Sequence, residues 1–516
     1  MRSPLQRENE VDTVISGKKV QLRGITHEDT SLIYQWVNRE DLRDLTGTLY
    51  PVSEYEHEQW IKNVTTDSKQ KLFAIYVDNS CIGTIGIKNI DYFNSNAELF
   101  ISIGEEAPDY AGGGTDAVNT LVDFCFKHLN LHKIYLHVFE SNKRAIRCYE
   151  KAGFHVEGNL LEHHFGQGKY ETVLVMGRIS MYIIIGASSF IGVYTADEFL
   201  KQSCEIIVTG RKNKFKEHYD SLGVEYINLD LTQPQDFEKL PKSGVDGVIL
   251  LGGLLPANAP VNLDYDENAA EYFQVNTIGT INVLEYCRKN GIQRVISNCS
   301  YADVRGTWGK KTITEDEPRD FIYTGDHAVY VFSKNAANDI LEYYNQQHNM
   351  KNAWFRFPPV YGVGPHDSLY INGELKKSGL KIFIDNASEG KDICIYGNKD
   401  LSRDVIYVKD VARAFYLAMK SEKTYGLYNM TSGQGVTLQQ QAEVIADLWA
   451  PAPDKKSKIT YKPEVVNNTP SYLFSMEKAR KDFGFVPEYA DFRVMMTDYK
   501  KDLDADKYRE LFNYVK

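Results

Sequence analysis

The chain has 516 residues, and its 59 Lys and Arg against 70 Asp and Glu give a formal net charge of −11. Hydrophobic residues make up 43% and charged residues 25%, ordinary globular values that exclude a mostly disordered, collagen-like or disulfide-scaffold protein. The acidic balance argues against nucleic acid as a partner, because nucleic-acid binding requires a basic surface. At roughly 150 residues per domain, the length favours two to four domains.

The cysteines and the apolar segments indicate the cellular compartment and argue against a metal site and a membrane span. The 7 cysteines show no Cys-x-x-Cys or Cys/His spacing typical of zinc, so we expect free thiols in a reducing compartment and no metal. The opening MRSPLQRENEVDTV lacks the apolar core of a signal peptide. The most apolar stretch, VDGVILLGGLLPANAP, is too short to span a bilayer. We therefore expect a cytoplasmic protein with no membrane partner.

Two blocks of structure follow a polar arm over residues 1–17. Over residues 18–179, strand-like and helix-like segments come in a mixed order, which favours one sheet with helices on both faces. At about Ser180 the pattern restarts with the strand YIII, and strands then alternate with helices, which predicts a parallel sheet. After about residue 360 the pattern becomes irregular, as expected of a smaller lobe. The prediction is an α/β protein with domains 18–179 and 180–516.

A glycine-rich loop marks the first block. The segment DYAGGGTDAVNTLVDFCF places Gly112, Gly113 and Gly114 between the strand-like AELFISIG and a helix. Glycines leave the backbone N–H groups uncovered, and at a helix N-terminus such groups bind a pyrophosphate. A triple glycine alone is equally compatible with a flexible surface loop.

A second segment of this block, ESNKRAIRCYEKAGF, supports the pyrophosphate interpretation. Here the sequence resembles the GNAT acetyltransferase superfamily, which reads R/Q-x-x-G-x-G/A at the phosphate loop and N-x-x-A-x-x-x-Y-x-x-x-G-F downstream. The downstream matches are Asn142, Ala145, Tyr149, Gly153 and Phe154. The opening LRGITHEDTSLIYQWVN also resembles the branch that acetylates ribosomal-protein N-termini and some amino sugars. One departure is Asp109, where the family has a basic or amide residue.

This resemblance implies how acetyl-CoA would bind and react. The cofactor would lie along the strand of Ile101 and Ile103, with its pyrophosphate on the amides from Gly112 to Thr115 and Asn142 at the mouth of the next helix. Tyr149 would be the general acid for the departing thiolate, although a buried aromatic has the same helical spacing. Our candidate general base is Glu98, acting through water, with His163 and His164 as alternatives. A solvated strand-end carboxylate is the competing interpretation of Glu98.

The second block opens with a candidate dinucleotide loop, GASSFIG. Its residues Gly186, Ser189, Phe190, Ile191 and Gly192 give the spacing G-x-x-S-x-x-G, with serine where the close approach of a pyrophosphate usually requires glycine.

The second strand of this block, EIIVTGRK, ends without an acidic residue. Its Arg211 is suited to the 2′-phosphate of NADP, so we expect NADP(H), with NAD as the alternative cofactor. The alternative is that Arg211 and Lys212 are a surface pair in a turn and bind no cofactor. Further on, Asp230 and Leu231 stand where an adenine ring is commonly flanked, and Gly252 and Gly253 end a strand that can face the cofactor.

A Tyr–Lys pair carries the chemistry expected of the second block. Tyr330 and Lys334 share one helix face, and the ammonium is expected to lower the pKa of the phenol so that it exchanges a proton at neutral pH. Ser300, after the strand RVISN, can hydrogen-bond the same substrate oxygen. The spacing alone leaves a surface Tyr–Lys pair as an alternative.

Residues of about 181–500 resemble the extended short-chain dehydrogenase/reductases of the nucleotide-sugar epimerase/dehydratase group. The matching segments are GASSFIG, QVNTIGTINVLEYC, YVFSK, RFPPVYGVGP and LSRDVIYVKDVARA. The resemblance implies a catalytic triad of Ser300, Tyr330 and Lys334, and it places Asn276 at the cofactor. It also implies that Arg403 and Tyr361 contact a nucleotide sugar, and that the protein can form a homodimer.

One departure bears on the reaction. The Asp–Glu pair that dehydratases place after the Ser/Thr is Tyr301 and Ala302 here, which removes the acid and base needed for elimination of water. We therefore expect a bifunctional enzyme that reduces or epimerises a nucleotide sugar and acetylates an amino sugar. The alternative is an acetyltransferase of protein N-termini or side chains with a non-catalytic, NADP-sensing or oligomerising Rossmann domain.

Overall fold

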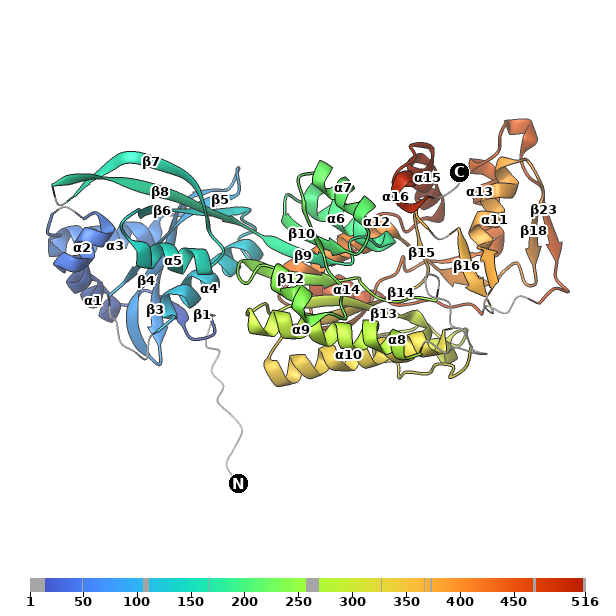
Figure 1. The fold of residues 1–516 in the computed structure, drawn as a ribbon, viewed down its shortest axis with the longest axis horizontal. Helices are drawn as coiled ribbons and strands as arrows, with labels where there is room; N and C mark the ends of the chain where they lie inside the picture. Colours follow the sequence, from blue (N-terminus) through green and yellow to red (C-terminus); the bar gives the residue numbers. More distant parts are fainter. Residues whose placement is uncertain are drawn as a thin grey trace, which may run out of the picture. The chain divides into compact units, whose positions relative to one another are not determined.

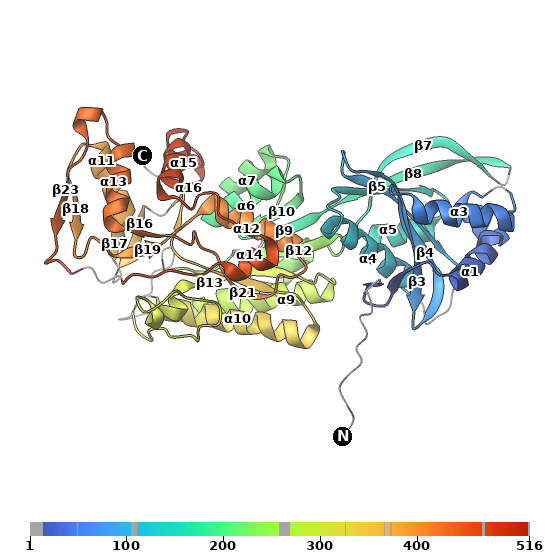
Figure 2. The ribbon, with the colours of Figure 1, turned by 180° about the vertical axis from the view of Figure 1, so that it is seen from behind.

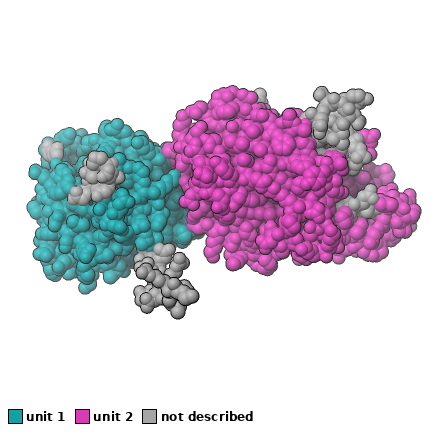
Figure 3. Space-filling view, turned by 90° about the horizontal axis from the view of Figure 1, so that it is seen from below, with its two compact units in different colours: residues 1–180 teal, residues 181–516 magenta. Residues whose placement is uncertain are grey.

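The computed structural model describes residues 14–48, 50–104, 111–166, 168–256, 269–325, 327–365, 367–371, 374–466 and 470–513. The chain divides into two compact units, residues 1–180 and 181–516, which Figure 3 colours separately. Each unit has its own main sheet and its own hydrophobic cores.

Unit 1, residues 1–180, is built on an eight-stranded sheet with the order β1-β2-β3-β4-β5-β6-β8-β7. The strands are β1 (Val14–Ser16), β2 (Gln21–Gly24), β3 (Lys71–Val77), β4 (Ser80–Asp91), β5 (Asn96–Ile103), β6 (Lys133–Phe139), β7 (His155–Gly166) and β8 (Lys169–Ile179). Neighbouring strands are antiparallel except for β5 and β6, which run parallel.

Helices pack on both faces of this sheet (Figures 1 and 2). They are α1 (His27–Val37), α2 (Glu40–Thr46), α3 (Glu54–Thr66), α4 (Gly113–Lys127) and α5 (Lys143–Lys151). The inner face carries α4 and α5, whose apolar side chains share one core with the inward residues of the strands. On the outer face, Asp29 of α1 accepts a hydrogen bond of 2.6 Å from the Tyr76 hydroxyl of β3. A capping box at Thr26 fixes where α1 begins.

The parallel pair β5–β6 is joined over only part of its length. Its three paired positions are Asn96–Lys133, Ala97–Ile134 and Glu98–Tyr135. Strand β5 nevertheless continues to Ile103, and β6 continues to Phe139. Beyond Glu98, the backbone groups on this edge of β5 therefore have no partner on β6, and the end of the pairing positions the candidate acyl-transfer site.

Unit 2, residues 181–516, contains a seven-stranded, wholly parallel sheet with the order β11-β10-β9-β12-β13-β14-β21. The strands are β9 (Met181–Ile185), β10 (Glu205–Gly210), β11 (Glu225–Asn228), β12 (Val245–Leu250), β13 (Val295–Ser300), β14 (Ala353–Phe357) and β21 (Gly426–Asn429). The central strands are apolar along nearly their whole length, as expected when both faces are covered.

Two helical layers cover this sheet (Figure 1). One contains α6 (Phe190–Lys201), α7 (Asn213–Ser221), α12 (Val408–Lys420) and α14 (Glu477–Phe483). The other contains α8 (Ala269–Phe273), α9 (Gly279–Lys289) and α10 (Ala328–His348). The chain order of the strands reverses between β9 and β12, and ligands of such sheets bind at the carboxyl ends of the strands beside that reversal.

A small lobe with its own apolar core follows in unit 2. Its helices are α11 (Gly379–Ser388), α13 (Leu438–Leu448) and α15 (Phe492–Asp504), and α16 (Arg509–Phe512) ends the described chain. Its short strands are β15 (Val360–Tyr361), β16 (Ser368–Ile371), β17 (Glu374–Lys377), β18 (Ile393–Tyr396), β19 (Ser402–Asp404), β20 (Ile406–Tyr407), β22 (Gly435–Thr437) and β23 (Ile459–Lys462).

The predicted fold class is confirmed: a mixed sheet comes first, and a Rossmann-like parallel sheet with a small lobe follows. Within the described ranges, the helices are too short or too polar for any of them to cross a membrane. The same residues contain no group of three His, Cys, Asp or Glu side chains placed to hold a metal ion.

Candidate active sites

The glycine loop of unit 1 forms the start of α4. Gly112 is the N-cap residue, and its φ of +84° requires glycine. The first helical hydrogen bond is donated by Asp116 to the Gly112 carbonyl, so the preceding amides of the turn remain available to a ligand. The Thr115 hydroxyl lies 3.2 Å from the Cys148 sulfur, which ties α4 to α5. This arrangement fits an anion at the N-terminus of α4.

A lysine that the sequence interpretation missed lies at the same loop. The Lys19 ammonium donates a 3.0 Å hydrogen bond to the Ala111 carbonyl. Its nitrogen lies 3.6 Å from the point where a Cβ on Gly112 would stand. The Asp116 carboxylate accepts hydrogen bonds from the backbone amides of Lys19 and Val20 and so holds this segment in place. Only folding brings Lys19 here, whereas Asp109 lies outside the described residues.

Asn142 precedes α5, and Tyr149 lies within this helix. Asn142 is the N-cap, and its side-chain oxygen accepts a 3.0 Å hydrogen bond from the Ala145 amide. Tyr149 is buried in the inner-face core against Phe154, and Ile101 and Ile103 of β5 pack at the edge of that core. Burial raises the pKa of Tyr149 well above its ordinary value, so the phenol stays protonated and can act as an acid.

Glu98 lies on the outer face of the sheet, on the opposite side from α5. Its Oε1 is 3.0 Å from Nδ1 of His137 and 3.2 Å from the Lys88 ammonium, and its Oε2 accepts a 2.9 Å hydrogen bond from Asn89. Burial alone would raise the pKa of this carboxyl, but the hydrogen bond from His137 and the charge of Lys88 hold it below its usual value. The sequence interpretation missed His137, which is distant in sequence from Glu98.

The two alternative bases lie on β7. His164 stacks on Phe139 with ring centroids 4.4 Å apart, and His163 is exposed. The partners of the Glu98 carboxylate among the described residues are His137, Lys88 and Asn89, and neither of these two histidines.

The candidate dinucleotide loop of unit 2 runs from β9 into α6. Gly186 has a φ of +88°, and a Cβ there would collide with the backbone of Gly252 at the end of β12. Ser189 caps α6 by accepting a 3.1 Å hydrogen bond from the Gly192 amide, which explains how serine is accommodated at this position. Phe190 is buried and Ile191 is partly buried against the helical layer.

Positive charge gathers after β10. The Arg211 guanidinium is 3.5 Å from the Asp230 carboxylate. The pKa of Lys212 is lowered by burial and by the neighbouring charges of Lys214 and Arg211. Three cations therefore lie close together where the 2′-phosphate of NADP is expected, and Lys214 goes beyond the Arg–Lys pair of the sequence interpretation.

Other predicted cofactor residues lie around the end of β12. Leu231 packs against Gly252, where a Cβ would stand 2.9 Å from it. Asn276 lies in a π-helical turn and uses its side-chain amide within the protein: it accepts from the Leu254 amide at 2.8 Å and donates to the Ser333 hydroxyl at 2.9 Å. Beside it, a Cβ on Gly253 would meet the Asn276 oxygen. Asn276 thus positions the loop after β12.

The predicted triad lies at the end of β13 and on α10. Ser300 closes β13, and its hydroxyl accepts a 3.2 Å hydrogen bond from the Ala302 amide. Tyr330 and Lys334 are both buried, and the Lys334 ammonium donates to Asn298 at 3.3 Å. Burial lowers the pKa of Lys334 to about 8.

The structure contradicts the expected lowering of the Tyr330 pKa. Burial raises the pKa of the phenol above its ordinary value, and nearby acidic groups such as Cys299 add to the shift. Desolvation disfavours the tyrosinate, so the phenol is protonated at neutral pH.

The predicted substrate residues meet in the small lobe. The positive charge of Arg403 on β19 acts on Tyr361, Tyr301 and Tyr472, and in each case it partly offsets the increase in pKa that burial causes. Tyr301 stacks on Trp308 with ring centroids 5.2 Å apart and an interplanar angle of 8°. The structure therefore brings Arg403 and Tyr361 together and adds an aromatic cluster that the sequence interpretation missed.

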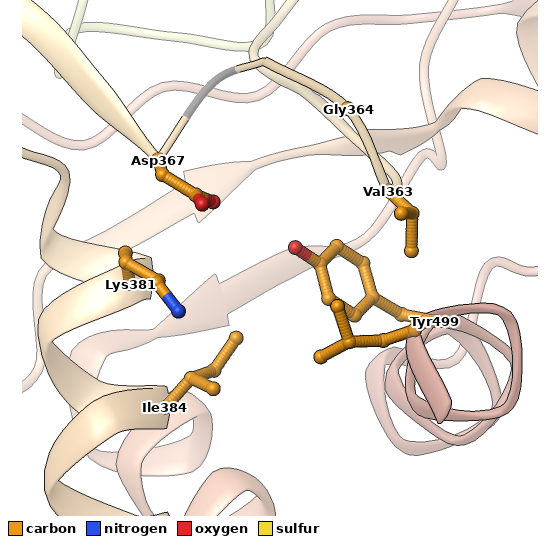
Figure 4. A pocket seen from close by; sticks show the side chains of 7 residues that line it. Val363, Gly364, Asp367, Lys381, Ile384 and Tyr499 are labelled. Carbon is orange, nitrogen blue, oxygen red and sulfur yellow. The ribbon is translucent and has the colours of Figure 1, made fainter. Parts of the chain in front are cut away.

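A small pocket elsewhere in this lobe contains none of these residues. Asp367, Lys381 and Tyr499 point toward it (Figure 4). Its volume of about 10 Å³ holds about one water molecule, far below the size of a nucleotide-sugar site. The Lys381 ammonium pairs with Asp385 at 2.8 Å, so the pocket is part of the packing of the lobe.

Comparison with known protein families assigns both halves of the chain. Residues 19–155 match the acetyltransferase (GNAT) domain, and residues 182–431 match the NAD-dependent epimerase/dehydratase family. These ranges contain the Gly112 loop and Tyr149 in one case, and the Gly186 loop, Tyr330 and Lys334 in the other.

Individual relatives agree with this division. A spermidine N(1)-acetyltransferase of Vibrio cholerae is 35% identical over 158 residues, 30% of this chain and 90% of that protein. Protein CapI of Staphylococcus aureus is 24% identical over 332 residues, 59% of this chain and 93% of that protein. A UDP-glucose 4-epimerase structure with UDP-glucose from Thermotoga maritima shares the fold of unit 2, with a TM-score of 0.51, 20% identity, and coverage of 63% of this chain and 99% of that one. Residues 19–155 thus belong to the GNAT acetyltransferase family, and residues 182–431 form a domain of the NAD-dependent epimerase/dehydratase family.

Proposed function

We propose that the protein is a bifunctional enzyme of nucleotide-sugar metabolism, with domains at residues 18–179 and 180–516. The second domain reduces or epimerises a keto centre of a nucleotide sugar with NADP(H), and the first acetylates an amino group of such a sugar. The observation that carries the proposal is the set of Ser300, Tyr330 and Lys334 beside the carboxyl ends of the parallel strands. A domain that only sensed a dinucleotide would need neither the phenol nor the ammonium there.

The residues of unit 2 fit a dinucleotide. Gly186 forms the tight turn that such a loop requires, because its φ is +88° and a Cβ there would collide with the backbone of Gly252. Asp230 and Leu231 would flank the adenine, and Arg211 with Lys212 would bind the 2′-phosphate. When bound, NADP(H) supplies or accepts the hydride.

The chain's own residues would manage the proton in the sugar reaction. Tyr330, protonated because it is buried, gives its proton to the carbonyl oxygen of the sugar as the carbinol forms. Ser300 hydrogen-bonds the same oxygen, and the buried ammonium of Lys334 stabilises the tyrosinate that remains. A dehydratase is disfavoured, because Tyr301 and Ala302 stand where dehydratases place the Asp–Glu pair that serves elimination.

In unit 1, acetyl-CoA would be the acyl donor. The amides from Gly112 to Thr115 and the ammonium of Lys19 would hold its pyrophosphate. Tyr149 protonates the leaving sulfur from the inner face, and the polar cluster around Glu98 on the outer face handles the proton of the amine.

Native mass spectrometry tests both sites in one experiment, with NADPH, NADH, acetyl-CoA and a panel of UDP-, GDP- and dTDP-sugars added singly. We expect acetyl-CoA, NADPH and one class of nucleotide sugar to bind, with NADPH bound more tightly than NADH. Binding of acetyl-CoA without any dinucleotide or sugar would contradict the bifunctional proposal and favour an acetyltransferase of proteins with a non-catalytic second domain.

A polyamine is the second candidate acceptor for unit 1. It is favoured by the 35% identity to the Vibrio cholerae spermidine N(1)-acetyltransferase. Acetyl-transfer assays with spermidine, spermine, amino-sugar nucleotides and peptides with free N-termini separate the acceptors. Transfer to amino-sugar nucleotides alone supports the leading proposal, and transfer to spermidine alone supports the second.

A further inference from the structure

The outer face of the unit 1 sheet contains a carboxylate–imidazole pair, Glu98 and His137. The proposed function leaves open which atom of this cluster accepts the proton of the amine. The Oε1 atom of Glu98 on β5 lies 3.0 Å from Nδ1 of His137 on β6. The Lys88 ammonium is 3.2 Å from the same oxygen, and Asn89 donates to the other at 2.9 Å. Three side chains from two strands thus hold the carboxylate in one orientation.

We propose that His137, oriented by Glu98, accepts the proton of the acceptor amine in acetyl transfer. The inference rests on the proposed acetyltransferase function and gives the proton-accepting role to an imidazole nitrogen. Glu98 is then a positioning residue, because both of its oxygens are already engaged and its carboxylate would have to leave three partners to take up a proton.

The hydrogen bond to Glu98 determines which imidazole nitrogen reacts. A carboxylate accepts hydrogen bonds, so Nδ1 of His137 carries the hydrogen and Nε2 keeps its lone pair. The side chain of His137 is 38% exposed, against 11% for Glu98. Within the described part of the chain, Nε2 of His137 has no hydrogen-bond partner. An oriented base with a free, accessible lone pair is the arrangement that general-base catalysis requires.

The position of His137 fits the place where the thioester would lie. The β5–β6 pairing ends at Glu98–Tyr135, and His137 is two residues farther along β6. Tyr149 lies in the inner-face core with Leu136 and Val138, the residues on either side of His137 that point the other way. The base and the acid are therefore on opposite faces of the sheet, so the amine can approach from the outer face while the sulfur is protonated from the inner face.

The reaction then balances with groups that the chain supplies. His137 takes one proton from the acceptor ammonium, and the free amine attacks the carbonyl carbon of the thioester. A C–N bond forms and the C–S bond breaks, and its electron pair leaves with the sulfur. Tyr149 gives its proton to that sulfur, the second proton of the nitrogen restores Tyr149 through water, and His137 releases its proton to solvent. The products are an amide, a thiol and one proton.

The groups that face the His137 imidazole come from several strands of the sheet. Glu98 on β5 and Lys88 on β4 are the charged groups closest to its imidazole. Tyr135 on its own strand faces it edge-on at a ring distance of 6.0 Å, and its partner on β8 is the non-titrating Val175. Beyond it on the same face, Phe139 carries the stacked ring of His164. Glu98→Gln therefore removes the negative charge that contacts the imidazole.

Steady-state kinetics of the full-length protein from pH 5.5 to 9 test the assignment, with the acceptor amine that the acetyl-transfer assays identify. In the wild type, kcat/KM should fall at low pH, because a protonated imidazole cannot accept a proton. In His137→Gln we expect kcat to fall at least about 100-fold and the low-pH decline to disappear, with the acetyl-CoA Kd from calorimetry unchanged within about threefold. The matched control His155→Gln replaces an exposed histidine on β7 and should behave like the wild type.

Glu98→Gln separates a positioning role from a basic one. The amide oxygen still accepts from Nδ1, so this variant should keep a tenth or more of the wild-type kcat while the low-pH decline moves to lower pH. Two-dimensional ¹⁵N NMR of the imidazole should show the Nδ1–H tautomer in the wild type and a mixture in Glu98→Gln. Unchanged thermal unfolding would exclude misfolding.

Three results would overturn the inference: His137→Gln with near wild-type activity, His164→Gln with the larger loss, or Glu98→Gln as inactive as His137→Gln with no shift of the pH profile. Failure of the proposed function looks different, since the wild type itself would then bind acetyl-CoA without acetylating any amine.

Discussion

The two units use the same local structure, a strand, a glycine at positive φ and a helix, in different surroundings. Gly112 has a φ of +84° and Gly186 a φ of +88°, and each stands just before a helix. In unit 1, a distant lysine, Lys19, lies beside the turn, whereas in unit 2 the backbone of Gly252 from the neighbouring strand closes over it. In the proposed function the local turn supplies anion-binding amides in both units, and the neighbouring chain segments determine which ligand fits.

The two candidate acids differ in a comparable way. Tyr149 and Tyr330 are both buried phenols whose pKa is raised by burial. Only Tyr330 has a buried ammonium, Lys334, one helical turn away. In the proposed reactions, Tyr149 gives up a proton without a neighbouring ammonium, whereas Lys334 would stabilise the tyrosinate that Tyr330 leaves.

The largest effect is expected for Tyr330→Phe. Without the phenol, no group can exchange the proton of the sugar oxygen, so sugar turnover should fall about 10³-fold. NADPH binding, measured by fluorescence titration, should change less than about threefold, and acetyl transfer should be unaffected. Retention of sugar turnover would remove the basis of the comparison between the two tyrosines.

Tyr149→Phe is expected to lower acetyl transfer about 100-fold, because the thiolate would then leave without an acid. The acetyl-CoA Kd and the sugar reaction should stay at wild-type values. A thioester donor with a more acidic leaving thiol should recover much of the lost rate, since such a thiolate needs no proton. Equal losses with both donors would contradict an acid role for Tyr149.

The pH dependence of the sugar reaction should show the loss of the positive charge of Lys334. Its pKa is lowered from 10.5 to about 8, so the ammonium is charged below that pH and loses its charge above it. We expect kcat for sugar turnover to decline above about pH 8, approaching tenfold per pH unit, whereas acetyl transfer should show no decline from this cause. Lys334→Arg, which stays charged, should remove the decline in whatever activity it retains.

Alanine at two glycines sharpens the comparison of the turns. Gly186→Ala places a Cβ against the Gly252 backbone at a φ of +88°, which costs at least about 1–2 kcal/mol and should weaken NADPH binding tenfold or more. Gly114→Ala has only ordinary contact with Ile103 at 3.8 Å and lies in a helix, so unfolding stability should not decrease. Chemical denaturation measures the free energy of unfolding of both variants. A Gly186→Ala variant with wild-type stability and normal NADPH affinity would contradict the close approach of the Gly186 and Gly252 backbones.

The smallest effects concern the cations at the two anion sites. Arg211→Ala should weaken NADPH about tenfold and NADH hardly at all, because only NADPH has the 2′-phosphate. Lys19→Ala should weaken acetyl-CoA up to about fivefold at low salt, because an exposed lysine contributes little. Acetyl-pantetheine, which lacks the pyrophosphate, is the control donor, and an equal effect of Lys19→Ala on both donors would exclude a phosphate contact.

The local sequence was sufficient to predict helices and turns where the residues that define them are close together in the chain. Asn142 and Tyr149 are close along the chain, and so are Gly186, Ser189 and Gly192, so their helices and turns could be predicted from spacing. The alternation of apolar strands and helices likewise predicted the parallel sheet of unit 2, because each βαβ unit is encoded in a contiguous segment.

Tertiary structure decided what depends on residues far apart in sequence. The pairing of Glu98 with His137 and the approach of Lys19 to the Gly112 turn arise from strand register and strand order. The pKa of Tyr330 rises because folding buries it, an effect that the i, i+4 spacing with Lys334 cannot reveal. The sequence by itself determined the elements and the turn geometry, since backbone preferences and periodicity are local. Charge, burial and proton affinity depend on neighbours in space, and only the folded chain provides them.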